Sequence, residues 1–251
     1  MINIRTMDEI KKIEKACKIS ARALEIGGNM CEEGVSSFEI DEAMRKFIIS
    51  QGARPNFLNC DGYPRSSCIS VNEVVIHGVP TRSVVLKRGD IVSIDVGAEY
   101  DGYNGDNAKT FVVGEVFKEV QDFLQTTEDS LYFGIEKAVV DNRVGDISYA
   151  IQETISRGGY GIVREFVGHG IGQSLHEEPQ IPNFIEDLSF KGPKLLEGMV
   201  IAIEPMTTIR EDLLEECEDG WGIRTVSNVL AAHYEHTVLI SKYGPVILTS
   251  L

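Results

Sequence analysis

Leu86-Lys-Arg-Gly-Asp-Ile-Val-Ser-Ile-Asp95 returns later in the chain as Leu195-Leu-Glu-Gly-Met-Val-Ile-Ala-Ile-Glu204. Each copy is a glycine turn followed by an apolar run that ends on a carboxylate. An apolar run of this length is typical of a buried strand. A charged group at the end of a buried strand is costly unless it is paired or coordinated. The repeat therefore predicts two related halves that share one site.

The same duplication appears in the order of the predicted elements. Two capping boxes, Thr6–Glu9 and Ser36–Glu39, begin two helices, and we expect the first helix to end at Gly27-Gly28. The later elements are strands over 68–113, helices over 120–157 and strands from 161 onward. Each half alone would expose a sheet face, so the halves should pack together.

These patterns predict an α+β protein with a single domain over 1–251. Within it we expect an internal duplication that divides the chain into about 1–118 and 119–251. No linker rich in Gly, Ser or Pro separates the halves, so we expect one continuous body and not two independent domains. Each half reads helix, helix, strands. The chain is long enough to bury a substantial core.

The composition excludes several classes of protein. A formal net charge of −15 argues against nucleic acid and anionic membranes as partners, since both need basic patches. No apolar run approaches the ~20 residues that span a membrane, and residues 1–10 are mixed and charged, unlike a signal peptide. The five cysteines have irregular spacings, which favours free thiols in a reducing compartment. We therefore expect a cytoplasmic location.

The duplication also predicts a pair of carboxylates in each half. A turn-rich loop over 98–105 follows Asp95, and a hairpin that returns beside its partner strand would bring Asp106 close to Asp95. In the second half, Glu235 leads into an apolar strand much as Asp106 does, and so joins Glu204. Four clustered carboxylates cannot all stay ionised without positive compensation, which one or two divalent metals would supply.

His169, flanked by Gly168 and Gly170, lies between the two copies and completes an oxygen-rich set of candidate ligands. Such a set suits Mn, Fe, Co or Zn ions better than a structural zinc site, which prefers thiolates. Two ions ~3.5–4 Å apart can activate a water and polarise a carbonyl, so amide or ester hydrolysis is the natural chemistry. His77 and His176 are the candidates for contacting the substrate.

Other acidic and histidine residues are not assigned to this site. We expect Glu177, Glu178, Asp187 and the run 211–218 to be solvated surface, and we assign neither His233 nor His236 to the metals. Taken singly, a strand-end Asp is usually a turn residue or a cap. The matching register of the duplicated carboxylates is what favours a metal site over that simpler interpretation.

At these residues the chain resembles the type I methionine aminopeptidases, which have the pita-bread fold: two pseudo-symmetric halves around a central antiparallel sheet. The resemblance runs from Thr6 to the C-terminus, and five ligands in order make it highly specific. The stretches that carry it are Gly62-Tyr63-Pro64, Asn72–Gly78, Ile94–Gly97, Gly105-Asp106, Gly168–Pro179, Ile203–Pro205, Asp219–Trp221 and Tyr234–Thr237.

The resemblance implies a role for each ligand. Asp95 would chelate one of two divalent ions (Co, Mn, Fe or Zn), His169 and Glu204 would bind the other, and the two remaining carboxylates, Asp106 and Glu235, would bridge them. Glu204 would also move the proton of the bridging water.

The family's histidines and reaction are implied in the same way. His176 would contact the scissile amide, and His77 the substrate nitrogen or leaving group. The reaction would remove the initiator methionine from nascent chains when the second residue is small, with the ribosome as a candidate place for it. We expect the enzyme to act as a monomer.

The methionine pocket departs from the family pattern. Tyr63 and Trp221 are retained, but Phe57 and Cys60 stand where the family commonly has Cys and Tyr, and Leu175 replaces a Phe. The pocket thus stays apolar with a changed shape. A Gln common two residues before the last ligand is His233 here, which could be a donor to a metal ligand, although simple drift is the favoured explanation.

Two other functions remain open from the sequence. Prolidases and aminopeptidase P share the five ligands, but usually carry a large N-terminal domain and Arg-x-Glu-Asp around the last ligand, where this chain has Tyr234-Glu235-His236. A binding module that kept the fold without catalysis is the third interpretation, and the complete ligand set argues against it.

Overall fold

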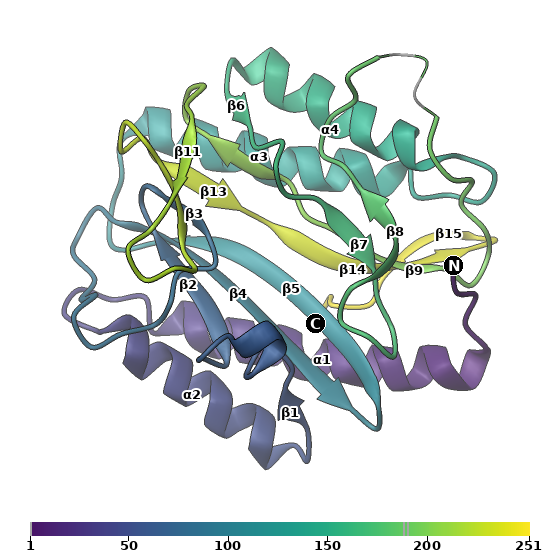
Figure 1. Cartoon of the computed structure of the whole chain (residues 1–251), viewed down its shortest axis with the longest axis horizontal. Helices are drawn as coiled ribbons and strands as arrows, with labels where there is room; N and C mark the ends of the chain where they lie inside the picture. The colour runs from purple at the N-terminus through teal and green to yellow at the C-terminus, as the bar shows by residue number, and fades with distance from the viewer. Residues whose placement is uncertain (1, 188, 190) are drawn as a thin grey trace.

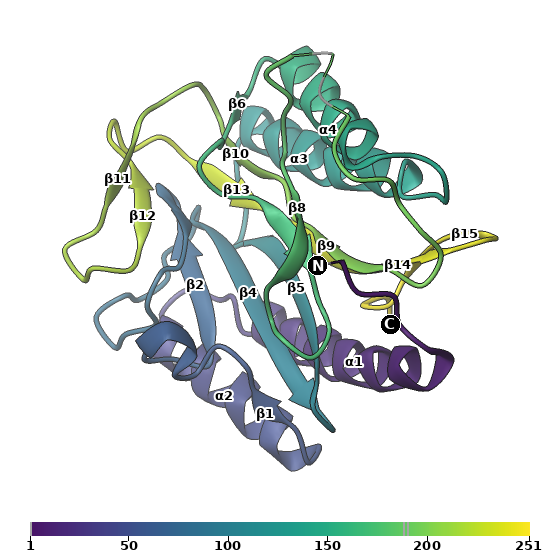
Figure 2. The ribbon, with the colours of Figure 1, turned by 45° about the vertical axis from the view of Figure 1, so that its right-hand side comes forward.

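The computed structural model describes every residue of the chain except 1, 188 and 190. Two pairs of helices enclose a large antiparallel sheet (Figure 1). Figure 2 shows the two helix pairs on opposite sides of the molecule, with the strands between them. The helices are α1 (Met7–Asn29), α2 (Ser37–Ser50), α3 (Lys118–Glu136) and α4 (Val144–Gly158), with a short 3-10 helix at Cys60–Gly62.

The large sheet has nine strands in the order β1-β4-β5-β14-β9-β7-β8, with β2 paired to β4 and β15 to β14. Its strands are β1 (Arg54–Pro55), β2 (Ser67–Val71), β4 (Ile91–Tyr100), β5 (Tyr103–Val112), β7 (Gly168–Gly170), β8 (Glu177–Ile181), β9 (Val200–Ile203), β14 (Glu235–Ser241) and β15 (Gly244–Ile247).

The other strands of the described residues form two three-stranded sheets, β13-β10-β6 and β11-β12-β3. They are formed by β3 (Val74–Ile76), β6 (Gly161–Ile162), β10 (Met206–Thr208), β11 (Leu214–Glu216), β12 (Ile223–Thr225) and β13 (Ala231–His233). The α+β fold predicted from the sequence is confirmed, while the division of the domain near residue 118 stays a prediction.

The repeated sequence occupies equivalent places in the large sheet. Its first copy forms β4, which pairs with β5, and its second copy forms β9, which pairs with β14. The inner strands β5 and β14 then pair with each other at Glu235 and Ala108. The four strands therefore run β4-β5-β14-β9, and each copy of the repeat delivers its carboxylate towards the seam between the halves.

The capping boxes at Thr6 and Ser36 are confirmed, since each side chain accepts a hydrogen bond from the backbone of the Glu three residues later. The predicted helix end at Gly27-Gly28 is wrong, because α1 continues to Asn29. The two glycines allow close packing instead: a Cβ at Gly28 would lie 2.1 Å from the ring of Phe111. They are helix-packing positions rather than a stop signal.

The loop predicted over 98–105 is also wrong. β4 and β5 continue through it and join at a two-residue turn, Asp101-Gly102, in which both residues have positive φ (51° and 79°). Asp-Gly is a preferred sequence for such a hairpin turn, because its twist matches that of the strands.

Candidate metal centre

The hairpin of β4 and β5 places two carboxylates side by side. Asp106 lies opposite Gly97 across the hairpin, and Gly97 is two residues from Asp95. Because side chains alternate along a strand, Asp95 and Asp106 share one face of the sheet. The prediction that the returning hairpin brings these carboxylates together is confirmed, although it does so through long strands instead of a loop.

The second half brings its ligands to the same place. Glu235 is the first residue of β14, and Glu204 directly follows β9, the neighbouring strand. His169 is the central residue of β7 and lies opposite Ala202 of β9. Consecutive strands β5, β14, β9 and β7 therefore supply four of the five predicted ligands, and β4 supplies the fifth.

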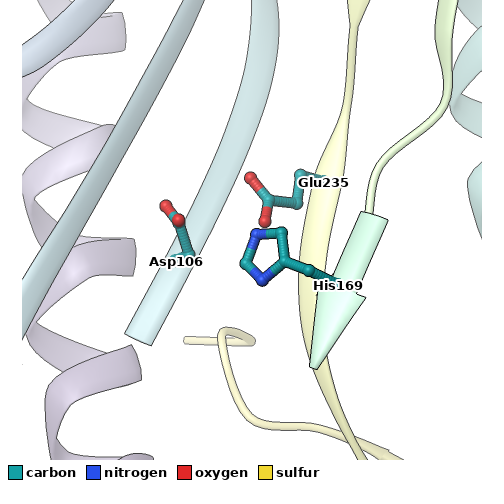
Figure 3. A group of neighbouring side chains, drawn as sticks. All are labelled: Asp106, His169 and Glu235. Atoms are coloured by element: carbon teal, nitrogen blue, oxygen red, sulfur yellow. The ribbon is translucent and has the colours of Figure 1, made fainter. Parts of the chain in front are cut away.

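The side chains converge, as Figure 3 shows for Asp106, His169 and Glu235. Potential ligand atoms of these three buried residues all lie within 4.8 Å of one another. Glu204 Oε1 is 3.5 Å from His169 Nε2. The rings of His169 and His176 meet edge to face, with their centroids 4.6 Å apart.

Burial and mutual repulsion act strongly on the carboxylates. Burial first, and then the neighbouring negative charges, raises the pKa of Asp95, Asp106 and Glu235 well above the usual range. One oxygen of each of these three side chains is buried without a hydrogen-bond partner among the residues that the structure describes. Unpaired buried carboxylate oxygens next to an imidazole fit a divalent cation, since such donors are the ligands that Mn, Fe, Co and Zn accept.

All five predicted ligands line one cavity of about 170 Å³. Its far end is apolar, where Tyr63 and Trp221 meet edge to face with ring centroids 5.3 Å apart. The structure places every predicted pocket residue in this lining, namely Phe57, Cys60, Tyr63, Leu175 and Trp221, together with His77 and His176. The predicted site residues are thus brought together in one place.

Two further residues of this cavity were missed by the sequence reasoning. Cys68 packs with Phe57 and Tyr63, and Asp61 lies in the same lining. Cys68 stands opposite Asp95 across β2 and β4. The alternation of side chains along the strand that begins at Cys68 could have indicated that Cys68 lies in the site. A strand that pairs with the first copy of the repeat must place one of its faces towards the site.

A second cavity, of about 530 Å³, opens from the same centre and shares five lining residues with the first: His77, Asp95, His169, His176 and Glu204. Phe166 forms part of its wall and meets His77 edge to face, with ring centroids 5.7 Å apart. The centre thus lies between a smaller cavity with an apolar end and a larger one.

His233 also lines the second cavity and therefore lies beside the site, although the sequence analysis did not assign it to the metals. Its ring is only 2% exposed, and its Nε2 is 3.4 Å from Glu204 Oε2. His236 instead interacts away from the ligands, with Nδ1 2.8 Å from Thr249 Oγ1.

The prediction that Glu177 is solvated surface is wrong. Its carboxylate forms an ion pair with Arg5, and the two side chains are 8% and 5% exposed. The same carboxylate accepts hydrogen bonds from Asn3 Nδ2 at 2.7 Å and from the backbone N–H of Ser174 at 3.0 Å. Arg5 is 172 positions away in sequence, so no local pattern could reveal this pair. It anchors the loop that carries His176.

Comparison with known proteins agrees with this geometry. The model of metallopeptidase family M24 matches residues 11–242. The chain is 44% identical to a methionine aminopeptidase of Aquifex aeolicus, over 100% of this chain and 99% of that protein. It is 42% identical to methionine aminopeptidase 1 of Bacillus subtilis, over 99% of both chains.

Solved structures agree with the sequence relatives. A methionine aminopeptidase from Thermotoga maritima superposes with a TM-score of 0.97 at 39% identity, over 100% of both chains. A prolidase from Pyrococcus furiosus gives 0.79 at 28% identity, over 99% of this chain and 65% of that one. The chain belongs to metallopeptidase family M24, whose members are metal-dependent peptide hydrolases. Within that family its full-length relatives place it with the methionine aminopeptidases, and the resemblance and pita-bread fold predicted from the sequence are confirmed.

None of the helices in the described part of the chain is both long and apolar enough to cross a membrane.

Proposed function

We propose that this protein removes an N-terminal methionine from peptides and nascent chains whose second residue is small, by hydrolysis that uses two divalent metal ions. The observation that carries the proposal is that the five predicted metal ligands and a cluster of apolar side chains line one cavity of about 170 Å³. An apolar part of the lining next to the reacting centre suits a single apolar side chain at the chain terminus.

In this proposal the five ligands are divided between two ions. Asp95 would hold one ion and His169 with Glu204 the other, while Asp106 and Glu235 would contact both. Raised pKa values of the buried carboxylates support this arrangement, because their charges need a cation for compensation. When bound, two such ions supply an activated water and polarise the scissile carbonyl. Co, Mn, Fe and Zn all suit these ligands.

Three side chains of the protein would then act on the substrate. Burial lowers the pKa of His77 and of His176 below the usual range, so both rings are neutral near pH 7. A neutral imidazole can still donate an N–H, and His176 would donate to the oxygen of the scissile amide as negative charge develops there. His77 would contact the amide nitrogen, and Glu204 would carry a proton from the attacking water to the leaving amine.

The pocket accounts for the choice of the first residue. The apolar part of the lining is formed by Phe57, Tyr63, Leu175 and Trp221, and Cys60 lines the same cavity. An unbranched, polarisable side chain such as that of methionine fills an irregular apolar space well. The rest of the peptide would leave through the second cavity. We infer that the protein works in the cytoplasm as a monomer on emerging chains at the ribosome.

A peptide panel tests the proposal. Metal-free protein is loaded with Mn²⁺ or Co²⁺ and assayed on Met-Ala-Ser, Met-Leu-Ser and Ala-Pro-Ala. We expect Met-Ala-Ser to be cleaved, activity to disappear with a chelator, and the other two peptides to be cleaved at least tenfold more slowly. Preferential cleavage of Ala-Pro-Ala would instead indicate a prolidase-like enzyme. No turnover of any peptide under any of the metals would contradict the proposed activity.

A further inference from the structure

We propose that His233 is a positioning residue for Glu204: its Nε2–H holds Oε2 of that carboxylate, which leaves Oε1 to face His169 and the metal. The inference rests on the proposed function, in which Glu204 both binds a metal and transfers a proton. It deepens that function by assigning a residue that controls how Glu204 is oriented.

The backbone of His233 is held firmly. His233 ends β13, opposite Met206 of β10. Its N–H donates to Thr110 Oγ1 at 3.0 Å, and the Thr110 hydroxyl also lies 3.0 Å from the His233 carbonyl oxygen. Ser93 Oγ is 2.9 Å from the same hydroxyl and ties it to β4. The ring therefore extends from a fixed point of attachment towards the metal centre.

Glu204 lies between two imidazoles. His169 Nε2 is 3.5 Å from Oε1, and His233 Nε2 is 3.4 Å from Oε2. His233 Nε2 is buried and has no hydrogen-bond partner among the described residues. A nitrogen that is buried and lies 3.4 Å from a carboxylate oxygen has that oxygen as its evident partner, once the ring and the carboxylate adjust their alignment. A movement of about 0.5 Å would shorten the contact to a charge-assisted hydrogen bond.

Such a contact matters because the two oxygens of a carboxylate are equivalent until different partners bind them. Glu204 directly follows the last residue of β9, and the imidazoles of His169 and His233 are the groups that face its two oxygens. Outer partners that orient a metal ligand typically change metal affinity or activity 10- to 100-fold. By holding Oε2, His233 would restrict the orientations that the Glu204 carboxylate can adopt. The carboxylate would then already be oriented to bind the metal and to reach the reacting water.

Two substitutions of similar size separate a hydrogen-bond role from space filling. His233→Gln retains an N–H donor at the end of the side chain, whereas His233→Met fills the space without one. Binding of Mn²⁺ to the metal-free proteins is measured by isothermal titration calorimetry. We expect the tighter site to weaken at least tenfold in H233M and less than threefold in H233Q, and kcat for Met-Ala-Ser to fall in the same order with little change in KM.

The calorimetry is independent of turnover, so the two proposals fail separately. If the unsubstituted protein binds Mn²⁺ but does not cleave Met-Ala-Ser, the proposed activity is wrong and the role of His233 is still measured. Equal Mn²⁺ affinities in all three proteins would overturn the role of His233. Electron spin echo modulation of the Mn²⁺-loaded protein should detect one directly bound imidazole nitrogen; two would make His233 a ligand and overturn the positioning role.

A measurement on the unsubstituted protein covers the case in which H233M does not fold. Long-range ¹H–¹⁵N spectra of the metal-free protein report which ring nitrogen of His233 carries the proton. We expect the proton on Nε2, facing Glu204. A neutral ring protonated only on Nδ1 could not donate to Oε2 and would overturn the proposal.

Discussion

Replacing Asp106 by Asn should stabilise the metal-free protein while it destroys the metal centre. Asp106 is 3% exposed and lies among other carboxylates, so without a cation its negative charge destabilises the folded state. Asn has nearly the same shape and no charge. The substitution therefore separates what the residue does for metal binding from what it costs the folded chain.

The magnitude follows from the spacing of the carboxylates. Ligand atoms of Asp106 and Glu235 lie within 4.8 Å, and at an effective dielectric constant of 20 two negative charges at that distance repel by about 3.5 kcal/mol. The protein relieves part of this repulsion by retaining protons, as the raised pKa values of both groups indicate. We therefore expect metal-free D106N to gain about 1–3 kcal/mol at pH 8.

The same argument gives the sign of the pH dependence. In the unfolded chain these carboxyls have ordinary pKa values, whereas burial raises the pKa of Asp95, Asp106 and Glu235 in the folded protein. As the pH rises from about 4 towards those raised values, the unfolded chain loses protons that the folded chain keeps. The stability of the metal-free protein contributed by these groups therefore falls over that window, and the fall should be smaller in D106N.

Urea unfolding in the presence of EDTA at several pH values measures these effects. Asp122→Asn is the matched control, since it removes the same charge from an exposed ion pair with Lys118 and should change stability by no more than about 0.5 kcal/mol. Adding Mn²⁺ at 100 times its Kd should stabilise the unsubstituted protein by about 2.7 kcal/mol and D106N much less. A metal-free D106N less stable than the unsubstituted protein, or one with intact Mn²⁺-dependent hydrolysis, would refute the reasoning.

Two more substitutions test how the fold supports the site. Arg5→Met leaves the largely buried Glu177 without its cation and should cost about 3 kcal/mol in urea unfolding, with slower turnover because the loop bearing His176 loses its anchor; no loss of stability would contradict this. Gly28→Ala places a methyl group against the Phe111 ring and should cost about 1–3 kcal/mol despite the higher helix propensity of alanine, and a more stable variant would show that the ring moves aside freely.

Local chemistry made much of this site predictable. Each half repeats an apolar run that ends on a carboxylate, although β4 itself continues past Asp95 to Tyr100 and Glu204 directly follows β9. Strand geometry then dictates which residues share a face. The family resemblance added the roles that spacing alone could not supply. The turn at Asp101-Gly102 could also have been predicted, because Asp-Gly between alternating residues is a strong hairpin signal. It was overlooked because the flanking residues 98–105 are rich in turn formers.

The remaining features depend on contacts between distant parts of the chain. Arg5 and Glu177 look like surface charges in their own sequence neighbourhoods, and only the folded chain shuts them away from water together. Gly27 and Gly28 have the composition of a helix end, but the partners Met44 and Phe111 make them packing positions within α1. No sequence periodicity predicts such contacts, since they depend on how helices and strands pack against one another.

By itself, then, the sequence predicted the α+β class and the residues that gather at the candidate metal centre, because strand period, turn chemistry and ligand spacing are local properties. The family followed from the resemblance of its motifs. Only the tertiary structure decided that β5 and β14 join the halves, that the apolar pocket and a larger cavity meet at the ligands, and that His233 faces Glu204. The physical reason is that burial and proximity arise from packing across the sheets. Packing of this kind brings the buried His233 next to the carboxylate of Glu204, which lies 29 positions before it in the chain.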